Sequence, residues 1–103
     1  MAICLIIENP DQTQEQAEQA IASVRSTGPM PPDGARLLMG GQAGAGWRFI
    51  SVWDTNDALD RFLAERLLPA YEHVGMSFDD VTHTRFELHT LLAGDLTGTP
   101  QPA

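Results

Sequence analysis

Several residue types that carry chemistry are scarce or missing in this chain. All six of its basic side chains are arginines, so the chain has no lysine. Catalysis through a lysine Schiff base and phosphate binding by a P-loop lysine are therefore excluded. Its one cysteine, Cys4, lies within an apolar run, so an intramolecular disulfide is excluded and a buried, unreactive thiol is expected. No apolar run approaches the ~20 residues that cross a bilayer, and the start lacks the basic region of a secretory signal, so we expect a cytoplasmic protein.

Positive charge is also scarce. Fourteen acidic residues face six basic ones, for a net charge of −8. Nucleic-acid binding depends on neutralising phosphates, and anionic membranes attract basic segments, so neither partner is expected. The motifs G-K-[ST], H-E-x-x-H, G-x-S-x-G and C-x-x-C are missing. We therefore expect no metal site and no cofactor.

The hydrophobic periodicity predicts strands and helices in the order β-α-β-β-α-β. The predicted strands are residues 2–8, 35–40, 46–53 and 82–93. The first predicted helix is residues 12–26. The second follows the N-cap residues 54–56, breaks or kinks at Pro69 and ends in a last turn at 70–74. This order is typical of a ferredoxin-like α+β fold, in which two helices cover one face of a four-stranded antiparallel sheet. The first and third strands, the most apolar, should be central. We expect one domain over residues 1–93 and a disordered tail over 94–103.

Strand 46–53 predicts a partner for the sheet. Both of its faces are apolar, since Trp47, Phe49 and Trp53 alternate with Ile50 and Val52. Two helices can cover one face only. The other face should then meet a second copy of the chain in a homodimer, a ligand, or both.

The last predicted strand carries the clearest candidate site. His83, Arg85, Glu87 and His89 recur at every second position and therefore share a face. The opposite face takes Thr84, Phe86, Leu88 and Thr90. If the apolar members of that set pack on the helices, the polar row lies on the uncovered side, within a dimer cavity. His83 or His89 could then remove a proton, Arg85 could stabilise the resulting oxyanion, and Glu87 could orient a histidine beside the substrate. The alternative is a solvated edge-strand face.

Aromatic side chains provide the candidate binding surface. Trp47, Phe49, Ser51 and Trp53 share one face of their strand and would line the same cavity if they have the orientation of the polar row. Aromatic rings with a few polar groups suit a flat, apolar molecule, and Tyr71 adds a further ring. Packing at a dimer interface is the alternative.

The segment FISVWDTNDALDRFL, residues 49–63, resembles the dimeric α+β barrel superfamily, and the likeness extends over about residues 2–93. The chain looks particularly like small actinobacterial members of the antibiotic-biosynthesis-monooxygenase type. The resemblance implies homodimers in which two sheets face each other, with a cleft between the sheet and the helices of each subunit. It implies a cofactor-independent oxygenase, cyclase or isomerase acting on an aromatic or polyketide-like compound.

Two other functions stay open on the same resemblance. One is a non-catalytic homodimer that binds a small molecule or serves as an accessory protein. The other is a haem-binding monooxygenase, because haem-degrading members resemble the chain in the segment around Trp53. Their axial histidine falls on Tyr71 when counted without gaps, with His73 two residues further on.

Overall fold

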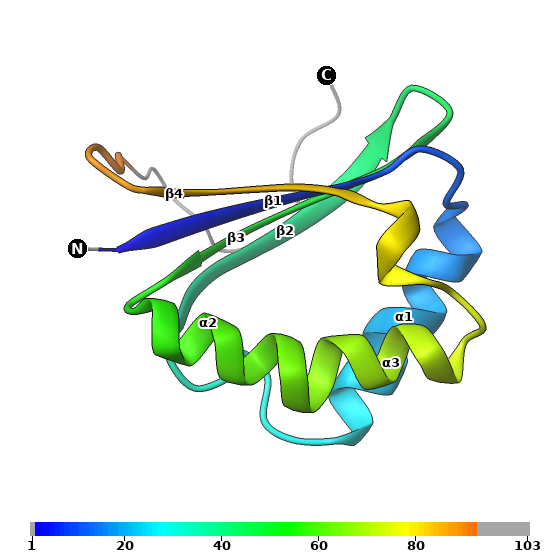
Figure 1. Ribbon diagram of the computed structural model, residues 1–103, viewed down its shortest axis with the longest axis horizontal. Helices are drawn as coiled ribbons and strands as arrows, with labels where there is room; N and C mark the ends of the chain where they lie inside the picture. Colours follow the sequence, from blue (N-terminus) through cyan, green and yellow to red (C-terminus); the bar gives the residue numbers. More distant parts are fainter. Residues whose placement is uncertain (1, 93–103) are drawn as a thin grey trace.

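The computed structural model describes residues 2–92 as a four-stranded antiparallel sheet with its helices on one face (Figure 1). Its elements are β1 (Ile3–Asn9), α1 (Gln14–Ser26), β2 (Ala35–Ala43), β3 (Gly46–Trp53), α2 (Asn56–Phe62), a π-helical turn η1 (Leu63–Leu67), α3 (Leu68–His73), a 3-10 turn η2 (Phe78–Asp80) and β4 (Thr82–Glu87). The expected tail, residues 94–103, lies outside the described residues. Within the described part, no helix is long and apolar enough to span a membrane.

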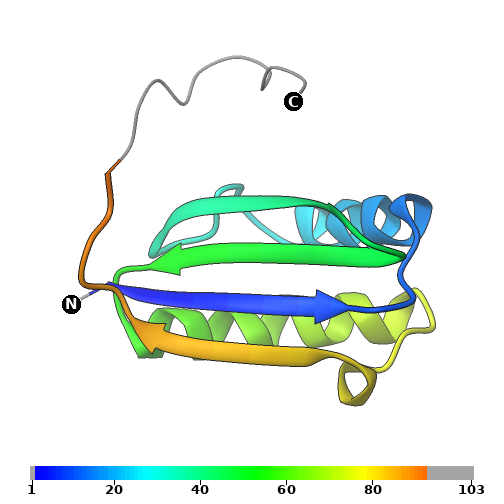
Figure 2. The same ribbon diagram turned by 90° about the horizontal axis from the view of Figure 1, so that it is seen from above.

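The strand order is β2-β3-β1-β4, with every neighbouring pair antiparallel. Figure 2 shows this order from above the sheet, with the helices behind it. The ferredoxin-like fold class is confirmed, and so is the prediction that the first and third strands are central. Central position explains the continuous apolar run of β1, because both faces of a central strand tend to be covered.

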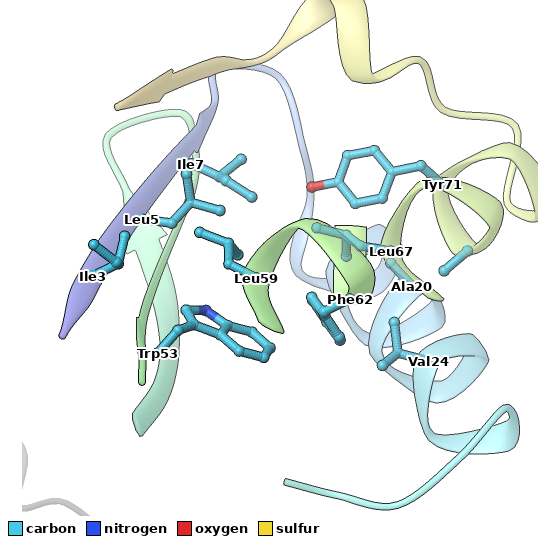
Figure 3. Packing of buried hydrophobic residues seen from close by; sticks show 11 residues of the cluster. Ile3, Leu5, Ile7, Ala20, Val24, Trp53, Leu59, Phe62, Leu67 and Tyr71 are labelled. Carbon is cyan, nitrogen blue, oxygen red and sulfur yellow. The ribbon is translucent and has the colours of Figure 1, made fainter. Parts of the chain in front are cut away.

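The strand registers show which side chains share a face. Ile3 pairs with Trp53, Ile7 with Phe49, and Asn9 with Trp47. Directly paired residues in an antiparallel sheet point to the same side. Figure 3 shows members of this set packed together with side chains of the helices. The aromatic face of β3 therefore contributes to the core beneath the sheet.

Helix α1 begins at a capping box. The Thr13 hydroxyl accepts from the Gln16 backbone N–H at 3.2 Å, and the Gln16 side-chain oxygen accepts from the Thr13 N–H at 3.0 Å. This pair satisfies two donors that a helix start otherwise leaves free. Ala17 and Ala20 are buried, and their small side chains let the helix approach the sheet closely.

Pro69 does not break the second helical segment. A proline lacks the N–H that would bond four residues back, and its ring crowds that carbonyl. Here the preceding turn widens, so that the Leu68 N–H donates to the carbonyl of Leu63, five residues earlier. The chain then continues as α3, with Pro69 in its first turn. The π-helical turn thus accommodates the proline.

Strand β4 differs from its sequence-based prediction in where it ends and in which face its polar row occupies. It ends at Glu87 rather than at residue 93. His83, Arg85 and Glu87 pair directly with residues of β1 that lie in the core, so this row is on the helix side of the sheet. Phe86 lies on the uncovered side and is 43% exposed. The predicted orientation of the row, toward the uncovered face, is therefore wrong.

The reason is the edge position of β4. Alternation shows which residues share a face, but it does not say which face the helices cover. At an edge, polar side chains on the helix side can reach solvent past the helices or bond to polar groups on them. Arg85 does the latter, since it donates to Asn56 and Asp60 of α2.

Candidate ligand-binding site

A cavity of about 190 Å³ lies between α1 and the β2–β3 half of the sheet. Its wall is mostly apolar. Five of the side chains that form it are Ile7, Ala20, Phe49, Phe62 and Leu67. Strands, α1 and the α2–α3 segment all contribute, so the cavity depends on the whole fold. Apolar concave sites with a few polar groups are typical of small-molecule binding.

Four polar side chains of the cavity wall gather where β1 ends. Asn9 is only 4% exposed, and Gln12, Trp47 and Tyr71 also belong to the cavity wall. The Tyr71 hydroxyl donates to Asn9 Oδ1 at 3.3 Å, and Figure 3 shows the Tyr71 side chain beside the core residues. Asn9 Nδ2 and Trp47 Nε1 are buried and have no hydrogen-bond partner among the described residues. Two residues of the cavity wall thus each carry a buried N–H without a partner in the described structure.

A glycine allows the backbones beside Asn9 and Trp47 to approach each other closely. Asn9 and Trp47 are cross-strand partners, and Gly46 begins β3 directly against the end of β1. A Cβ at Gly46 would collide with the Asn9 carbonyl oxygen and would lie 2.6 Å from the carbonyl carbon of Pro10. Any larger residue would therefore push the two strands apart. This close backbone approach holds Asn9 beside Trp47.

Arg25 and Met30 also belong to the cavity wall. Met30 lies in the connection between α1 and β2, which Arg66 fastens to the helices. The Arg66 guanidinium donates to the backbone carbonyl of Val24 at 2.7 Å and to that of Pro29 at 2.8 Å. It thus caps the end of α1 and fixes the adjoining part of the wall.

The titratable groups of the wall restrict its chemistry. Within the described residues, the wall contains no Asp, Glu, His or Cys; its ionisable members are Arg25 and Tyr71. Burial raises the pKa of the Tyr71 phenol above its usual value, and the hydrogen bond with Asn9 acts in the opposite direction with a smaller effect. Tyr71 is therefore a neutral hydrogen-bonding group at neutral pH. The described wall offers no side chain suited to act as a general base there.

The cavity contains three of the five predicted substrate-binding residues, namely Trp47, Phe49 and Tyr71. Trp53 is fully buried in the core, with its ring centre 4.9 Å from that of Phe62. Glu87 is exposed on β4. The cavity itself lies beneath the sheet, on the helix side, and not on the uncovered face where the sequence predicts it.

The predicted catalytic residues His83, Arg85 and His89 are not part of this wall. Arg85 forms an ion pair with Asp60 at 2.8 Å. The ring centre of His83 lies 5.5 Å from that of Phe78. His89 follows the end of β4 and is exposed. Catalytic roles for these three residues stay predictions.

Asn9 and Gln12 are the wall residues that sequence reasoning missed. With Pro10 and Asp11 between them, they have the composition of a turn that ends a strand. The available signal was the alternation of β1, which places Asn9 on the same face as the core residue Ile7. A polar side chain on a core-facing position is unusual enough to indicate a site.

The residues present do not fit a haem. Tyr71 occupies the position expected for the axial ligand, but its buried phenol has a raised pKa and donates to Asn9. A phenolate ligand would require the pKa to be lowered instead. His73 is exposed on α3 and is not part of the cavity wall. The haem-binding alternative therefore has no support in this site.

Comparisons with known proteins bear on the fold. No protein-family model matches the chain, and a search of curated proteins finds no significant match. Among solved structures, the chain is similar to Rv0793 from Mycobacterium tuberculosis, with a TM-score of 0.67 and 17% identity over 90% of this chain and 100% of that one. It is similar to SnoaB, a cofactor-independent oxygenase from Streptomyces nogalater, with a TM-score of 0.63 and 18% identity over 88% and 95% of the two chains.

A third similar structure is a dimeric ferredoxin-like protein of unknown function from Jannaschia sp. CCS1, with a TM-score of 0.60 and 12% identity over 85% of this chain and 100% of that one. At these identities the likeness concerns the fold. The chain has the ferredoxin-like α+β fold of the antibiotic-biosynthesis-monooxygenase-like proteins, as its sequence predicts.

Proposed function

We propose that the protein is a homodimeric small-molecule enzyme that works without a cofactor, and that the cavity beneath the sheet is its substrate site. The observation that carries this proposal is an apolar, aromatic-lined cavity with a few polar side chains, Asn9, Gln12 and Tyr71 among them, in its described wall. The apolar wall suits a flat ring, and the polar side chains suit an oxygen on that ring. Polar groups buried without a partner are rare in proteins and often mark a functional site.

Among the reactions implied by the family resemblance, oxygenation of an acidic aromatic substrate fits this cavity best. Cyclases and isomerases move protons within the site, and the described wall offers no side chain suited to that role. A phenol or enol that ionises on its own does not require a base from the protein. The resulting anion would add dioxygen at a ring carbon and supply both electrons of the new C–O bond, and the hydroperoxide formed on protonation would lose water to leave the oxygenated product. SnoaB, which shares the fold, is a cofactor-independent oxygenase.

The homodimer would form through the uncovered face of the sheet. Phe86 is 43% exposed there and Met39 is 48% exposed, with Ile6, Ile50 and Leu37 partly buried between them. An apolar face of this kind favours a protein partner over solvent. The similar protein from Jannaschia is dimeric. A second copy of the chain is therefore the partner that we propose.

A non-catalytic homodimer that binds the same class of molecule is the second candidate. The observation that favours it is the same lack of a general base in the described part of the wall. Binding needs only the apolar wall and the hydrogen-bond donors. The two candidates differ in turnover and not in where the ligand lies.

Oxygen uptake tests the first candidate. A panel of phenols and hydroxynaphthoquinones would be incubated with the protein in an oxygen electrode. We expect uptake to fall at least tenfold in Gly40→Ala, since the new Cβ would lie 3.0 Å from Trp47 Nε1 and 3.2 Å from Phe49 Cδ2. Gly41→Ala is the matched control on the same strand, because its Cβ would meet nothing within 4 Å. Ligands that bind without any oxygen uptake would favour the non-catalytic candidate.

A further inference from the structure

We propose that the ligand of this cavity carries a carboxylate, which binds the Arg25 guanidinium at the cavity mouth while the apolar body of the ligand lies inside. This inference rests on the proposed function in one respect only, namely that the cavity binds a small molecule. It adds the charge of the substrate and the residue that selects for it.

The first argument is where the cavity opens. Its wall residues on β1 and on the α2–α3 segment are buried. Its exposed members all lie between the last turn of α1 and strand β2, and they are Arg25, Met30, Met39 and Gly40. The mouth of the cavity is therefore on this side, and Arg25 borders it.

The second argument is the position of Arg25 on its helix. Residues four positions apart share a helix face, and Ala17, Ile21 and Arg25 follow this spacing and all belong to the cavity wall. The apolar stripe of α1 thus ends in one charged side chain. An arginine can lay its aliphatic stem along apolar surface while its guanidinium stays in water. Arg25 is therefore placed to bind the part of a ligand that leaves the cavity.

The third argument is that the Arg25 guanidinium is not used by the fold. Within the described part of the chain, it takes part in no ion pair and no side-chain hydrogen bond. Three other arginines, Arg36, Arg48 and Arg85, form ion pairs with carboxylates. Arg66 donates to backbone carbonyls. Arg25 differs from these four in having its donors available.

No acidic residue stands at the positions that usually pair with a helical arginine. Such partners lie three or four residues away. Around Arg25 these positions hold Ile21, Ala22, Gly28 and Pro29. The described cavity wall also contains no Asp or Glu. In a chain with a net charge of −8, this wall thus presents a positive group without a negative one beside it.

Arg66 contacts the same mouth but is already engaged. Its guanidinium donates to the carbonyls of Val24 at 2.7 Å and Pro29 at 2.8 Å, and its Nη2 lies 3.7 Å from Met30 Sδ. These contacts hold the connection that carries Met30 against the helices. Arg66 therefore shapes the mouth, and Arg25 is the arginine left to bind a ligand.

A carboxylate is the group that these observations favour. The guanidinium is a planar fork of N–H donors that matches the two oxygens of a carboxylate. At the mouth the carboxylate keeps part of its hydration, so that only the apolar body of the ligand is fully removed from water. Combined with the proposed oxygenation, this gives a phenol or enol that bears a carboxylate as the substrate class.

The end of α1 offers Arg25 a second role. A positive charge in the last turn of a helix interacts favourably with the carbonyl groups that are left free there. This role predicts that removal of the charge lowers stability without changing the choice of ligand. The two roles therefore differ in a measurable way.

Two ligands of the same shape and different charge test the inference. In phenylpropanamide, an amide group replaces the carboxylate of phenylpropanoate. Binding of both would be measured by titration calorimetry at low salt. We expect the wild-type protein to prefer phenylpropanoate, and we expect Arg25→Gln to reduce this preference by about threefold to tenfold, as for a partly exposed charged hydrogen bond. Added salt should reduce the preference of the wild type more than that of Arg25→Gln.

Arg61→Gln is the matched control. Arg61 is exposed on α2 and is not part of the cavity wall, and its replacement changes the net charge by the same amount. We expect it to leave the preference for phenylpropanoate unchanged. The affinity for phenylpropanamide shows whether the cavity is intact in each variant.

Equal affinities of the wild-type protein for the two ligands would overturn the inference and leave the cavity as a ligand site. A preference that Arg25→Gln leaves unchanged, or that Arg61→Gln reduces equally, would also overturn it. Lower stability of Arg25→Gln in urea with an unchanged preference would assign Arg25 to the helix end alone. Failure of both ligands and of the phenol panel to bind would reject this inference and the proposed function together. Selective binding without oxygen uptake, tested with phenols that bear a carboxylate, would reject only the enzyme.

Discussion

The pair Asn9–Tyr71 should make the protein less stable than an apolar pair would. Asn9 leaves its Nδ2 buried and unpaired within the described structure, while Oδ1 accepts from Tyr71. We consider the double variant Asn9→Leu/Tyr71→Phe, in which leucine is close to asparagine in size and shape. The change removes the Tyr71 hydroxyl and both polar atoms of the Asn9 amide together, so no polar atom of the pair stays behind.

The expected magnitude follows from the groups that are removed. An unpaired buried donor costs about 1–3 kcal/mol, and a typical hydrogen bond contributes about 0.5–1.5 kcal/mol. Removing both should therefore stabilise the protein by about 1 kcal/mol. Tyr71→Phe alone should destabilise it by about 1–3 kcal/mol, because Asn9 Oδ1 is then unpaired as well. Asn9→Leu alone removes one unpaired group and creates another on Tyr71, so its net effect should be small.

Urea unfolding at one fixed protein concentration would measure these differences, since a dimer's stability depends on concentration. A gain of about 1 kcal/mol corresponds to a rise in Tm of roughly 4–8 °C for a domain of this size. A double variant at least about 1 kcal/mol less stable than the wild type, with an unchanged urea dependence, would refute the reasoning. It would mean that Asn9 serves the fold and not a ligand.

Four further outcomes are expected. Gly46→Ala should destabilise the protein by about 3 kcal/mol or more in urea unfolding, because its Cβ would collide with the Asn9 carbonyl oxygen; a near-neutral change would show that the strands can separate there. Arg85→Ala should cost less than about 1 kcal/mol and leave ligand binding to the cavity unchanged, since its ion pair is largely exposed; a tenfold loss of turnover at constant affinity would support its predicted catalytic role. Phe86→Asp should convert a dimer to a monomer in light scattering at micromolar concentration, and a persisting dimer would put the interface elsewhere. Because its pKa is raised, Tyr71 holds its proton more tightly in the folded protein than in the unfolded chain. The contribution of this proton to the free energy of unfolding is complete below about pH 10 and is lost as the pH rises through the raised value. Tyr71→Phe should therefore lose less stability than the wild type between about pH 9 and 11, and identical losses would contradict the shift.

Local signals in the sequence predicted most of the fold. The alternation of residues 46–53 and the apolar run of β1 each depend on neighbours only a few positions away. The order of elements then limits the sheet to a few topologies, and the ferredoxin-like one is common. Pro69 shows the limit of local reasoning. A proline predicts a break or kink, but the contacts of the surrounding helix favour a widened turn that keeps the helix continuous.

The orientation of β4 could not be read from its own residues. Either face of this strand could lie toward the helices or away from them. The polar ends of His83 and Arg85 can reach solvent from the helix side, and Phe86, which alternates with them, can lie on an apolar outer surface. The observed orientation is favoured by Asp60, which lies 25 positions before Arg85 and accepts a hydrogen bond from its guanidinium. It is also favoured by the apolar outer surface that Phe86 joins. Neither partner is visible in a window of a few residues.

The candidate site depends even more on distant contacts. Asn9 becomes a buried side chain only because Gly46 lets β3 approach its backbone and because Tyr71, 62 positions away, donates to it. The local sequence around Asn9 is therefore the same whether Asn9 serves only a turn or also a site. The feature that indicates a site is its unpaired buried donor, which exists only in the folded chain. For a domain of this size the sites worth testing first are therefore polar atoms that the fold buries and does not satisfy, and Asn9 with Trp47 meets that criterion where the exposed row of β4 does not.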